Sequence, residues 1–315
     1  MLNFVTKRIL SMLLVVLGIS FLIFSVMSLS PGDPAQIILG DGASQEDIAE
    51  LREEMGLNDN LLVRFFRYIW NAIQGDLGNS YRTGQAVLVE LLNRLPNTVL
   101  LAIFGVGAAA MIGVPIGIIS AVKQYSIIDN VTMVLAMVMT SIPAFWLGLL
   151  LMLRFALGWG VVPAIGVDTW QGYILPSVTL AIGNMAVIIR MTRSTMLEVF
   201  REDYIRTARA KGASKRSVVL KHALRNALLP IITTIGINFG IQLGGAIVVE
   251  TVFSIPGLGT LIITSVRQKD IPMVMGAILF VALMICLVTF LMDILYTFLD
   301  PRVKIKKRQK QMGVI

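Results

Sequence analysis

Long apolar runs, most of them near 20 residues, alternate with shorter polar stretches along the chain. A helix rises 1.5 Å per residue, so about 20 apolar residues cross a hydrocarbon layer about 30 Å thick. The runs lack the alternation of apolar and polar residues that is typical of a membrane β-barrel. The pattern predicts an all-α integral membrane protein with six transmembrane helices, at Ile9–Leu29, Val99–Val122, Val131–Leu153, Tyr173–Ile189, Leu228–Val249 and Met273–Leu299.

The first apolar run has the charges of a secretory signal, because Lys7 and Arg8 precede it. It is longer than a typical signal core, however, and a turn at Ser30–Pro34 follows it in place of a small-residue cleavage site. We expect an uncleaved anchor helix. The chain then divides into an anchor over 1–30, an extracytoplasmic region with short helices over 31–96, a five-helix core over 97–301 and a basic tail over 302–315.

The region between the first two runs has helical patterns of its own. Ser44 is a suitable N-cap for one helix. A second helix presents a broad apolar face with Leu62, Phe65, Phe66, Ile69, Trp70 and Ile73. Two interpretations stay open for this second helix. It either packs on the outer ends of the spans, or it is an interfacial or partner-docking helix.

Small residues recur every four positions in two of the runs, at Gly105, Ala109, Gly113 and Gly117 and at Gly236, Gly240 and Gly244. Such stripes allow membrane helices to approach closely. Prolines at 115, 143 and 176 are expected to break or kink their spans.

Charge predicts the orientation of the chain. With six spans, 19 of the 27 Lys and Arg residues lie on the side of the two termini, ten of them in the segment 190–225. The positive-inside rule therefore predicts that both termini and the 190–225 segment are cytoplasmic. This bias and anionic membrane lipid account for the isoelectric point of about 9.8, so no nucleic-acid partner is expected.

The sequence offers no chemistry of its own. Cys286 cannot form a disulfide within the chain, and His222 has no metal-ligating neighbours. The G-x-x-x-x-G-K-[ST] phosphate loop is absent, and so are the usual hydrolase motifs. Asp293 is the one charge inside a predicted span, and we expect it to pair with a neighbouring helix. It leaves open the alternative of an ion-coupled secondary transporter.

The basic segment before Pro230 reads as two helices joined by a turn. The first is expected over 194–211, with Val199, Tyr204, Ile205 and Ala208 on one side and Arg201, Arg206 and Arg209 on the other. Gly212 is expected to end this helix and Ser214 to cap the next one, which leads into the membrane. Such a protruding pair of helices could transmit motion from a partner to two spans.

This segment resembles the coupling loop of a known transporter family. The run Tyr204–Gly212 followed by Leu228-Leu229-Pro230 is similar to the cytoplasmic loop of permeases in binding-protein-dependent ABC importers, in particular the peptide/nickel group. Arg206-Thr207-Ala208 stands where the general motif has Glu-Ala-Ala, with Gly212 in register. Three further segments resemble landmarks of the same family and follow in the same order along the chain: Ser30–Pro34, Glu250–Phe253 with Pro256–Gly259, and Leu299–Arg302.

The resemblance implies a type I importer permease that pairs with a homologous second permease. Two ATP-binding subunits, which carry ATP and Mg, and an extracytoplasmic solute-binding protein complete the machine, so this chain holds no cofactor or metal and is not itself an enzyme. The coupling loop, about 190–227, would meet the ATPase through Asp203, Tyr204, Arg206, Thr207, Ala208, Ala210, Lys211 and Gly212. The implied cargo is a di- or oligopeptide, with nickel chelates or glutathione as alternatives.

Overall fold

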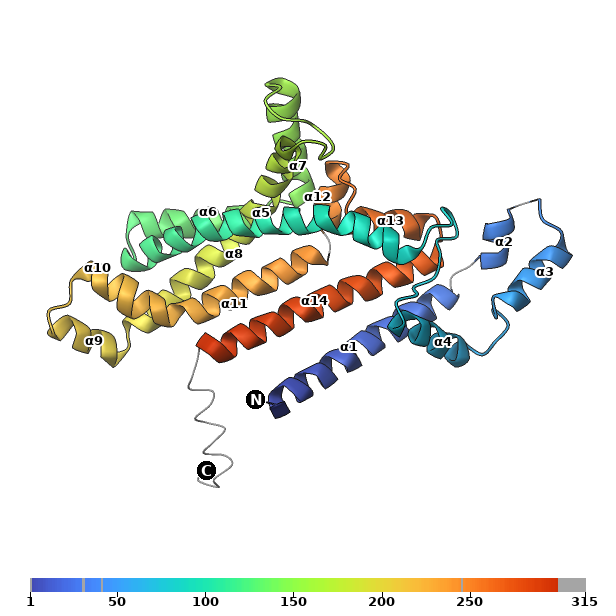
Figure 1. The fold of residues 1–315 in the computed structure, drawn as a ribbon. Helices are drawn as coiled ribbons and strands as arrows, with labels where there is room; N and C mark the ends of the chain where they lie inside the picture. The colour runs from blue at the N-terminus through green and yellow to red at the C-terminus, as the bar shows by residue number, and fades with distance from the viewer. Residues whose placement is uncertain (1, 30–31, 41, 245, 300–315) are drawn as a thin grey trace. The chain divides into compact units, whose positions relative to one another are not determined.

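The computed structural model describes residues 2–29, 32–40, 42–244 and 246–299, and these are almost entirely helical (Figure 1). Its chain divides into two compact units. The first consists of Met1–Thr98 and Pro256–Cys286, and the second of Val99–Ile255 and Leu287–Ile315. Two long helices, α5 (Val87–Val122) and α14 (Ile271–Leu299), continue from one unit into the other. The predicted 302–315 tail, residues 30 and 31 of the Ser30–Pro34 turn, and Asp300-Pro301-Arg302 lie outside the described residues.

The first unit contains, besides parts of α5 and α14, the helices α1 (Leu2–Leu29), α2 (Pro34–Leu39), α3 (Gln45–Glu54), α4 (Leu61–Ile73) and α13 (Leu258–Arg267). Local capping determines where the short helices begin. Asp33 accepts a hydrogen bond from the Ala35 amide, and Ser44 accepts one from the Asp47 amide, as the sequence predicts for the start of that helix. Phe65 of α4 is buried against Phe21 and Phe24 of α1, so α4 does pack on a span.

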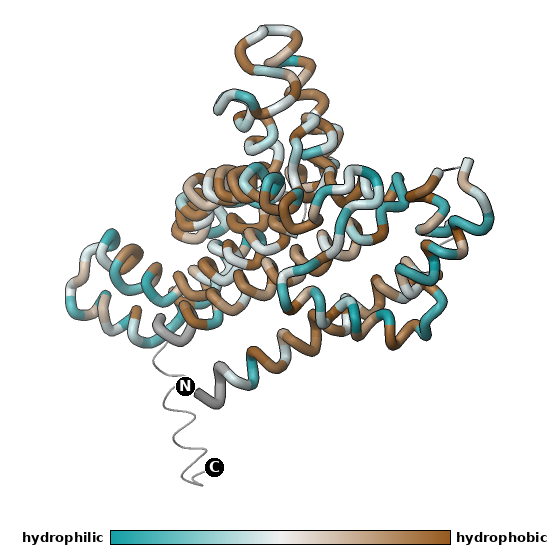
Figure 2. Tube along the Cα trace, turned by 45° about the vertical axis from the view of Figure 1, so that its right-hand side comes forward, coloured by the Kyte–Doolittle hydropathy of each residue, from teal (hydrophilic) through white to brown (hydrophobic). Residues whose placement is uncertain are grey.

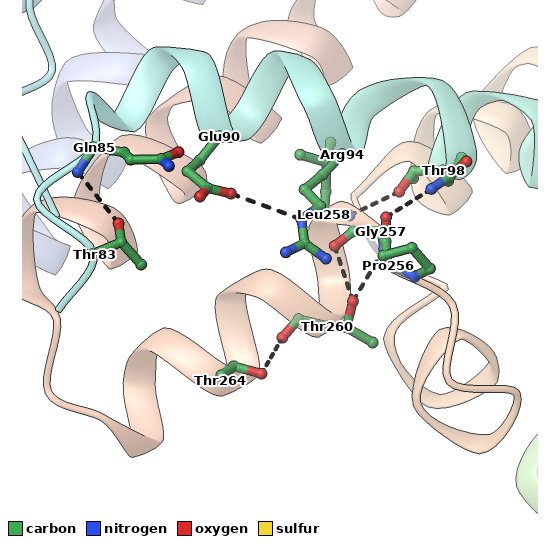
Figure 3. A network of polar contacts seen from close by, with 11 residues as sticks. Thr83, Gln85, Glu90, Arg94, Thr98, Pro256, Gly257, Leu258, Thr260 and Thr264 are labelled. Carbon is green, nitrogen blue, oxygen red and sulfur yellow. Dashed lines mark hydrogen bonds and ion pairs between the residues drawn. The ribbon is translucent and has the colours of Figure 1, made fainter. Parts of the chain in front are cut away.

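Polar contacts attach the start of α13 to α5 (Figure 3). The Asn97 side chain donates to the Pro256 carbonyl over 2.9 Å, and the Leu258 amide donates to the Thr98 hydroxyl over 2.9 Å. The Thr260 hydroxyl accepts from the Gly257 amide and closes the first turn of α13. The Pro256–Gly259 landmark thus caps a helix and fixes it to α5.

The second unit contains the rest of α5 and α14 together with α6 (Ile127–Ser141), α7 (Ala144–Leu151), α8 (Ile174–Phe200), α9 (Asp203–Ala210), α10 (Lys215–Ser217), α11 (Leu224–Leu243) and α12 (Ile247–Val252). A π-helical segment, Met152–Gly158, extends α7, and another, Val218–Ala223, joins α10 to α11. Figure 2 shows apolar residues dominating the long helices and polar residues dominating α9 and α10.

The small-residue stripes are sites of close helix packing, as the sequence predicts. A Cβ added at Gly117 of α5 would lie 2.6 Å from the Thr192 Cβ of α8, and one at Gly113 would lie 3.2 Å from Ile188. In α11, Gly236 faces Met292 of α14. Larger side chains at these positions would separate the helices.

Five helices are long and apolar enough to cross a membrane, and a bent pair forms a sixth candidate span. The prediction of six spans is therefore confirmed, but several predicted ranges are wrong in detail. The second span begins at Val87, twelve residues before Val99, and the fourth continues past Ile189 to Phe200. The fifth runs over Lys215–Leu243 in place of Leu228–Val249, and it ends before α12 begins.

The third predicted span, Val131–Leu153, is not one straight helix. It consists of α6 and α7, which meet at an angle of 96°. Pro143 causes the break because it has no amide hydrogen and holds the preceding Ile142 in extended backbone. The other two prolines do not break their helices: Pro115 lies inside the continuous α5, and Pro176 lies in the first turn of α8.

Candidate functional site

The predicted coupling loop forms a small helical hairpin at one end of α8 and α11 (Figure 1). The expected continuous helix over 194–211 is wrong. Helix α8 ends at Phe200, and α9 begins at Asp203 after a turn at Arg201 and Glu202. The sequence has no Gly or Pro at this turn, and the turn lets Ile205 of α9 be buried.

Gly212 ends α9 in the conformation that the sequence predicts. Its φ angle is +82°, which is the left-handed region that glycine adopts without strain. The Gly212 amide donates to the Arg209 carbonyl, and the Ala213 amide donates to the Ala208 carbonyl, both within 3.1 Å. These two bonds form a Schellman motif. Ser214 then caps the next helix by accepting from the Ser217 amide, so the predicted turn is confirmed.

Ile205 anchors the hairpin to the membrane helices. Its side chain is fully buried. It belongs to an apolar cluster that draws on α5, α8, α9, the π-helical segment and α11 and consists of Ala121, Met196, Ile205, Val218, Ala223, Ala227 and Ile231. A cluster packed this way moves as one body, because a dense interior transmits displacement.

The predicted coupling residues surround Ile205 on the surface of the hairpin. Ala208 is half-buried, and the others are exposed: Asp203, Tyr204, Arg206, Thr207, Ala210, Lys211 and Gly212. Tyr204, predicted on the same side of the helix as Ile205, is 40% exposed, whereas Ile205 is buried. Asp203 and Arg206 approach to 3.7 Å at the surface, and the Thr207 hydroxyl donates to the Asp203 carbonyl. The structure therefore brings these residues together on one outward surface.

A hollow of about 690 Å³ lies beside the hairpin. Arg201, Arg209 and Lys215 line it, together with apolar side chains that include Leu197 and Phe200. Positive charge over an apolar floor suits an acidic partner surface.

A buried ion pair that the sequence analysis did not consider lies near the hairpin. Asp129 of α6 is 1% exposed and binds Arg193 of α8 through two bonds, from Nε over 2.6 Å and from Nη2 over 2.7 Å. The same carboxylate accepts from the Ser120 hydroxyl of α5 and from the Tyr125 amide. Three helices are thus held together by one carboxylate. The separation of 64 positions between the partners hides this pair from any local sequence pattern.

The buried side of the hairpin is packed against α5, α8 and α11. Among the described residues, no group of three or more His, Cys, Asp or Glu side chains could hold a metal ion.

Two family models match the chain. Residues 113–305 match the "Binding-protein-dependent transport system inner membrane component" family, and residues 1–102 match its N-terminal membrane component. The glutathione transport system permease protein GsiC of Salmonella typhimurium strain LT2 is 43% identical over 97% of this chain and 100% of that protein. GsiC of Escherichia coli strain K12 is 42% identical over the same shares.

Solved structures share the fold at lower identity. A chain of the inward-facing MetNI methionine ABC transporter superposes with a TM-score of 0.59 at 19% identity, covering 67% of this chain and 96% of that chain. An amino acid ABC transporter solved with histidines gives a TM-score of 0.50, also at 19% identity, over 66% of this chain and 92% of that chain.

Proposed function

Because the chain belongs to the binding-protein-dependent transport system inner membrane components and is the permease subunit of a peptide/nickel-type ABC importer, we propose that its α9–α10 hairpin is where a partner ATPase drives it. The observation that carries this proposal is the full burial of Ile205 beneath an exposed set of predicted coupling residues. A partner that grips the exposed side moves the buried side, and with it the ends of α5, α8 and α11.

The charge of the hairpin supports an acidic partner groove. Between 201 and 216, six cationic residues are exposed and only two acidic ones, so the surface carries a net positive charge. Complementary charge speeds the encounter and suppresses wrong partners. We expect two ATP-binding subunits, which hold ATP and Mg, a second homologous permease and an extracytoplasmic solute-binding protein. Hydrolysis takes place in the ATP-binding subunits, and this chain is not catalytic.

The orientation follows from the positive-inside bias. The hairpin and both termini face the cytoplasm of the bacterial inner membrane, with 19 of the 27 Lys and Arg residues on that side. The alternative of a secondary transporter that relies on Asp293 loses its basis, because the family match covers residues 113–305, which include Asp293 and most of the core.

We propose a short peptide as cargo. The GsiC relatives are named for glutathione, which is itself a short peptide, and they align over nearly the entire chain. Nickel chelates remain the alternative within the same machinery.

The test is a charge reversal on the hairpin, Arg206→Glu, in the complex purified from its native membrane in a mild detergent. The Arg206 side chain is 76% exposed, so the change leaves the fold intact. We expect the amount of ATPase recovered with the chain, and with it the vanadate-sensitive ATP hydrolysis, to fall by about tenfold or more. A tenfold loss of affinity corresponds to about 1.4 kcal/mol of binding free energy. Arg82→Glu, an exposed charge reversal in the first unit, is the matched control and should behave like the unaltered chain. Full recovery of a coupled ATPase with Arg206→Glu would refute the assignment.

A further inference from the structure

Helix α4 has three distinct faces. The inner face packs on its neighbours through Phe65, Tyr68, Ile69 and Ala72. A polar edge carries Arg64, Arg67 and Asn71. The third face is an exposed apolar stripe of Leu62, Phe66, Trp70 and Ile73, whose side chains are 51–75% exposed. The spacing of four, four and three residues places these side chains on one line along the helix.

The position of α4 along α1 sets the depth of this stripe. Phe65 contacts Phe21 and Phe24, which precede the end of α1 at Leu29 by eight and five residues. At 1.5 Å per residue, α4 lies about 7–12 Å inside the end of that span. Interfacial helices bury their apolar face about 5–10 Å into the boundary between headgroups and acyl chains. The depth therefore suits a helix lying along the membrane interface.

The helix on which α4 packs also carries exposed apolar side chains. Leu22 and Val26 of α1 are each more than half exposed. Within the apolar stretch Thr6–Leu29 of α1, only 17% of the most apolar window is buried, the lowest share among the five unbroken candidate spans in the described residues. A span this apolar and this uncovered suits contact with lipid. The stripe of α4 and the outer face of α1 are thus both apolar and uncovered.

The composition of α4 also favours lipid. Its sequence, LLVRFFRYIWNAI, contains two arginines and no acidic residue. Trp and Tyr are typical of the interface. Arg67 pairs with Asp59 over 2.6 Å, so the aromatic residues of α4, more than its arginines, favour lipid. From the stripe, its depth and its neighbour, we propose that α4 is an interfacial helix whose Leu62, Phe66, Trp70 and Ile73 stripe lies in phospholipid where α1 leaves the membrane. This inference does not depend on the coupling role of the hairpin.

The experiment places nitroxide labels around α4 in the full chain, reconstituted in bilayers of three parts zwitterionic to one part anionic phospholipid. In a Cys286→Ala background, single changes Phe66→Cys, Trp70→Cys and Ile73→Cys probe the stripe, and Asn71→Cys on the polar edge is the matched control. Collision rates with oxygen, which concentrates in lipid, are compared with those of a water-soluble nickel complex. At the three stripe positions we expect the collision rate with oxygen to exceed that with the nickel complex by severalfold. At position 71 we expect the nickel complex to give the higher rate.

Two results would overturn the proposal. Greater access of nickel than of oxygen at 70 and 73 would place the stripe in water. Shielding from both reagents in the assembled importer would show that another protein surface covers it. If Cys286→Ala does not fold, brominated phospholipid replaces the labels. The fluorescence lost in Trp70→Phe relative to the unaltered chain then reports Trp70 alone, and we expect bromine to quench that component at least twofold. An unquenched component contradicts the proposal.

Discussion

Replacing Ile205 by alanine should release α9 from the membrane helices without altering the exposed face of the hairpin. Ile205 is fully buried in the cluster with Met196 and Val218. The change removes three carbon atoms, and about 0.8 kcal/mol per buried methylene gives a transfer loss of about 2.4 kcal/mol. The cavity left behind adds to this, so the total lies in the range of about 2–5 kcal/mol known for such changes.

Hydrogen exchange of the full chain in lipid nanodiscs measures this loss directly. Amides of 203–217 exchange when the hairpin opens locally, so their protection reports the stability of its docking. A loss of about 2.4 kcal/mol corresponds to a decrease in protection of about 60-fold. Leu220→Ala is the matched control, because Leu220 follows the hairpin closely but is 45% exposed. It should lower the protection by less than about fivefold, since it opens no cavity.

The coupling proposal adds a second expectation for Ile205→Ala. The ATPase should still bind, because the exposed residues remain, but its hydrolysis should no longer depend on transport. Unchanged protection in Ile205→Ala would refute the argument that Ile205 holds the hairpin. Lost protection together with fully coupled transport would instead refute the argument that a firmly docked hairpin transmits the displacement of the ATPase to the membrane helices.

Three further changes test other contacts. Gly212→Val should uncouple transport from ATP hydrolysis, because a valine at φ +82° costs about 1–2 kcal/mol in backbone strain. The cost is not a clash, since a Cβ at this position would meet no neighbour. Gly212→Asn should largely restore transport, because asparagine tolerates this conformation. Asp129→Asn should lower the stability of the detergent-solubilised chain to denaturant by about 3–5 kcal/mol, because it leaves Arg193, whose side chain is only 22% exposed, without its charge partner. Adding Arg193→Met should recover part of the loss, and equal stability of the single and double variants would contradict this. Gly117→Val should lower the stability of the chain by about 1–3 kcal/mol in the same assay. Gly107→Val is the control, because the space around Gly107 is open. Equal losses in the two variants would contradict close packing at Gly117.

Features governed by neighbouring residues could be predicted from the sequence. Ser44, Ser214 and Gly212 begin and end their helices as expected, because capping depends on side chains two or three positions away. The membrane spans follow equally from continuous apolar runs. The division of the chain into four parts remains a prediction.

Features that depend on distant contacts could not be predicted. The turn at Arg201 and Glu202 has no breaker residue, and it lets Ile205 be buried against residues as far away as Ala121. The pair Asp129–Arg193 lies on two helices whose side chains show no shared local pattern. Hydropathy also treats Val131–Leu153 as one span because every residue near Pro143 is apolar or small.

The 96° bend at Pro143 bears on how the chain is assembled in the membrane. Insertion machinery that sorts nascent segments by hydropathy meets Val131–Leu153 as a single stretch to be released sideways into lipid. The bend must then form after release, in surroundings where an unsatisfied carbonyl costs several kcal/mol. The Thr140 and Ser141 hydroxyls donate to the Met137 carbonyl, one turn before the bend. The carbonyls of the last four residues of α6 lose their helical amide donors at the bend. The bend is therefore a place where the nascent segment depends on donors from its surroundings, from neighbouring helices or from water.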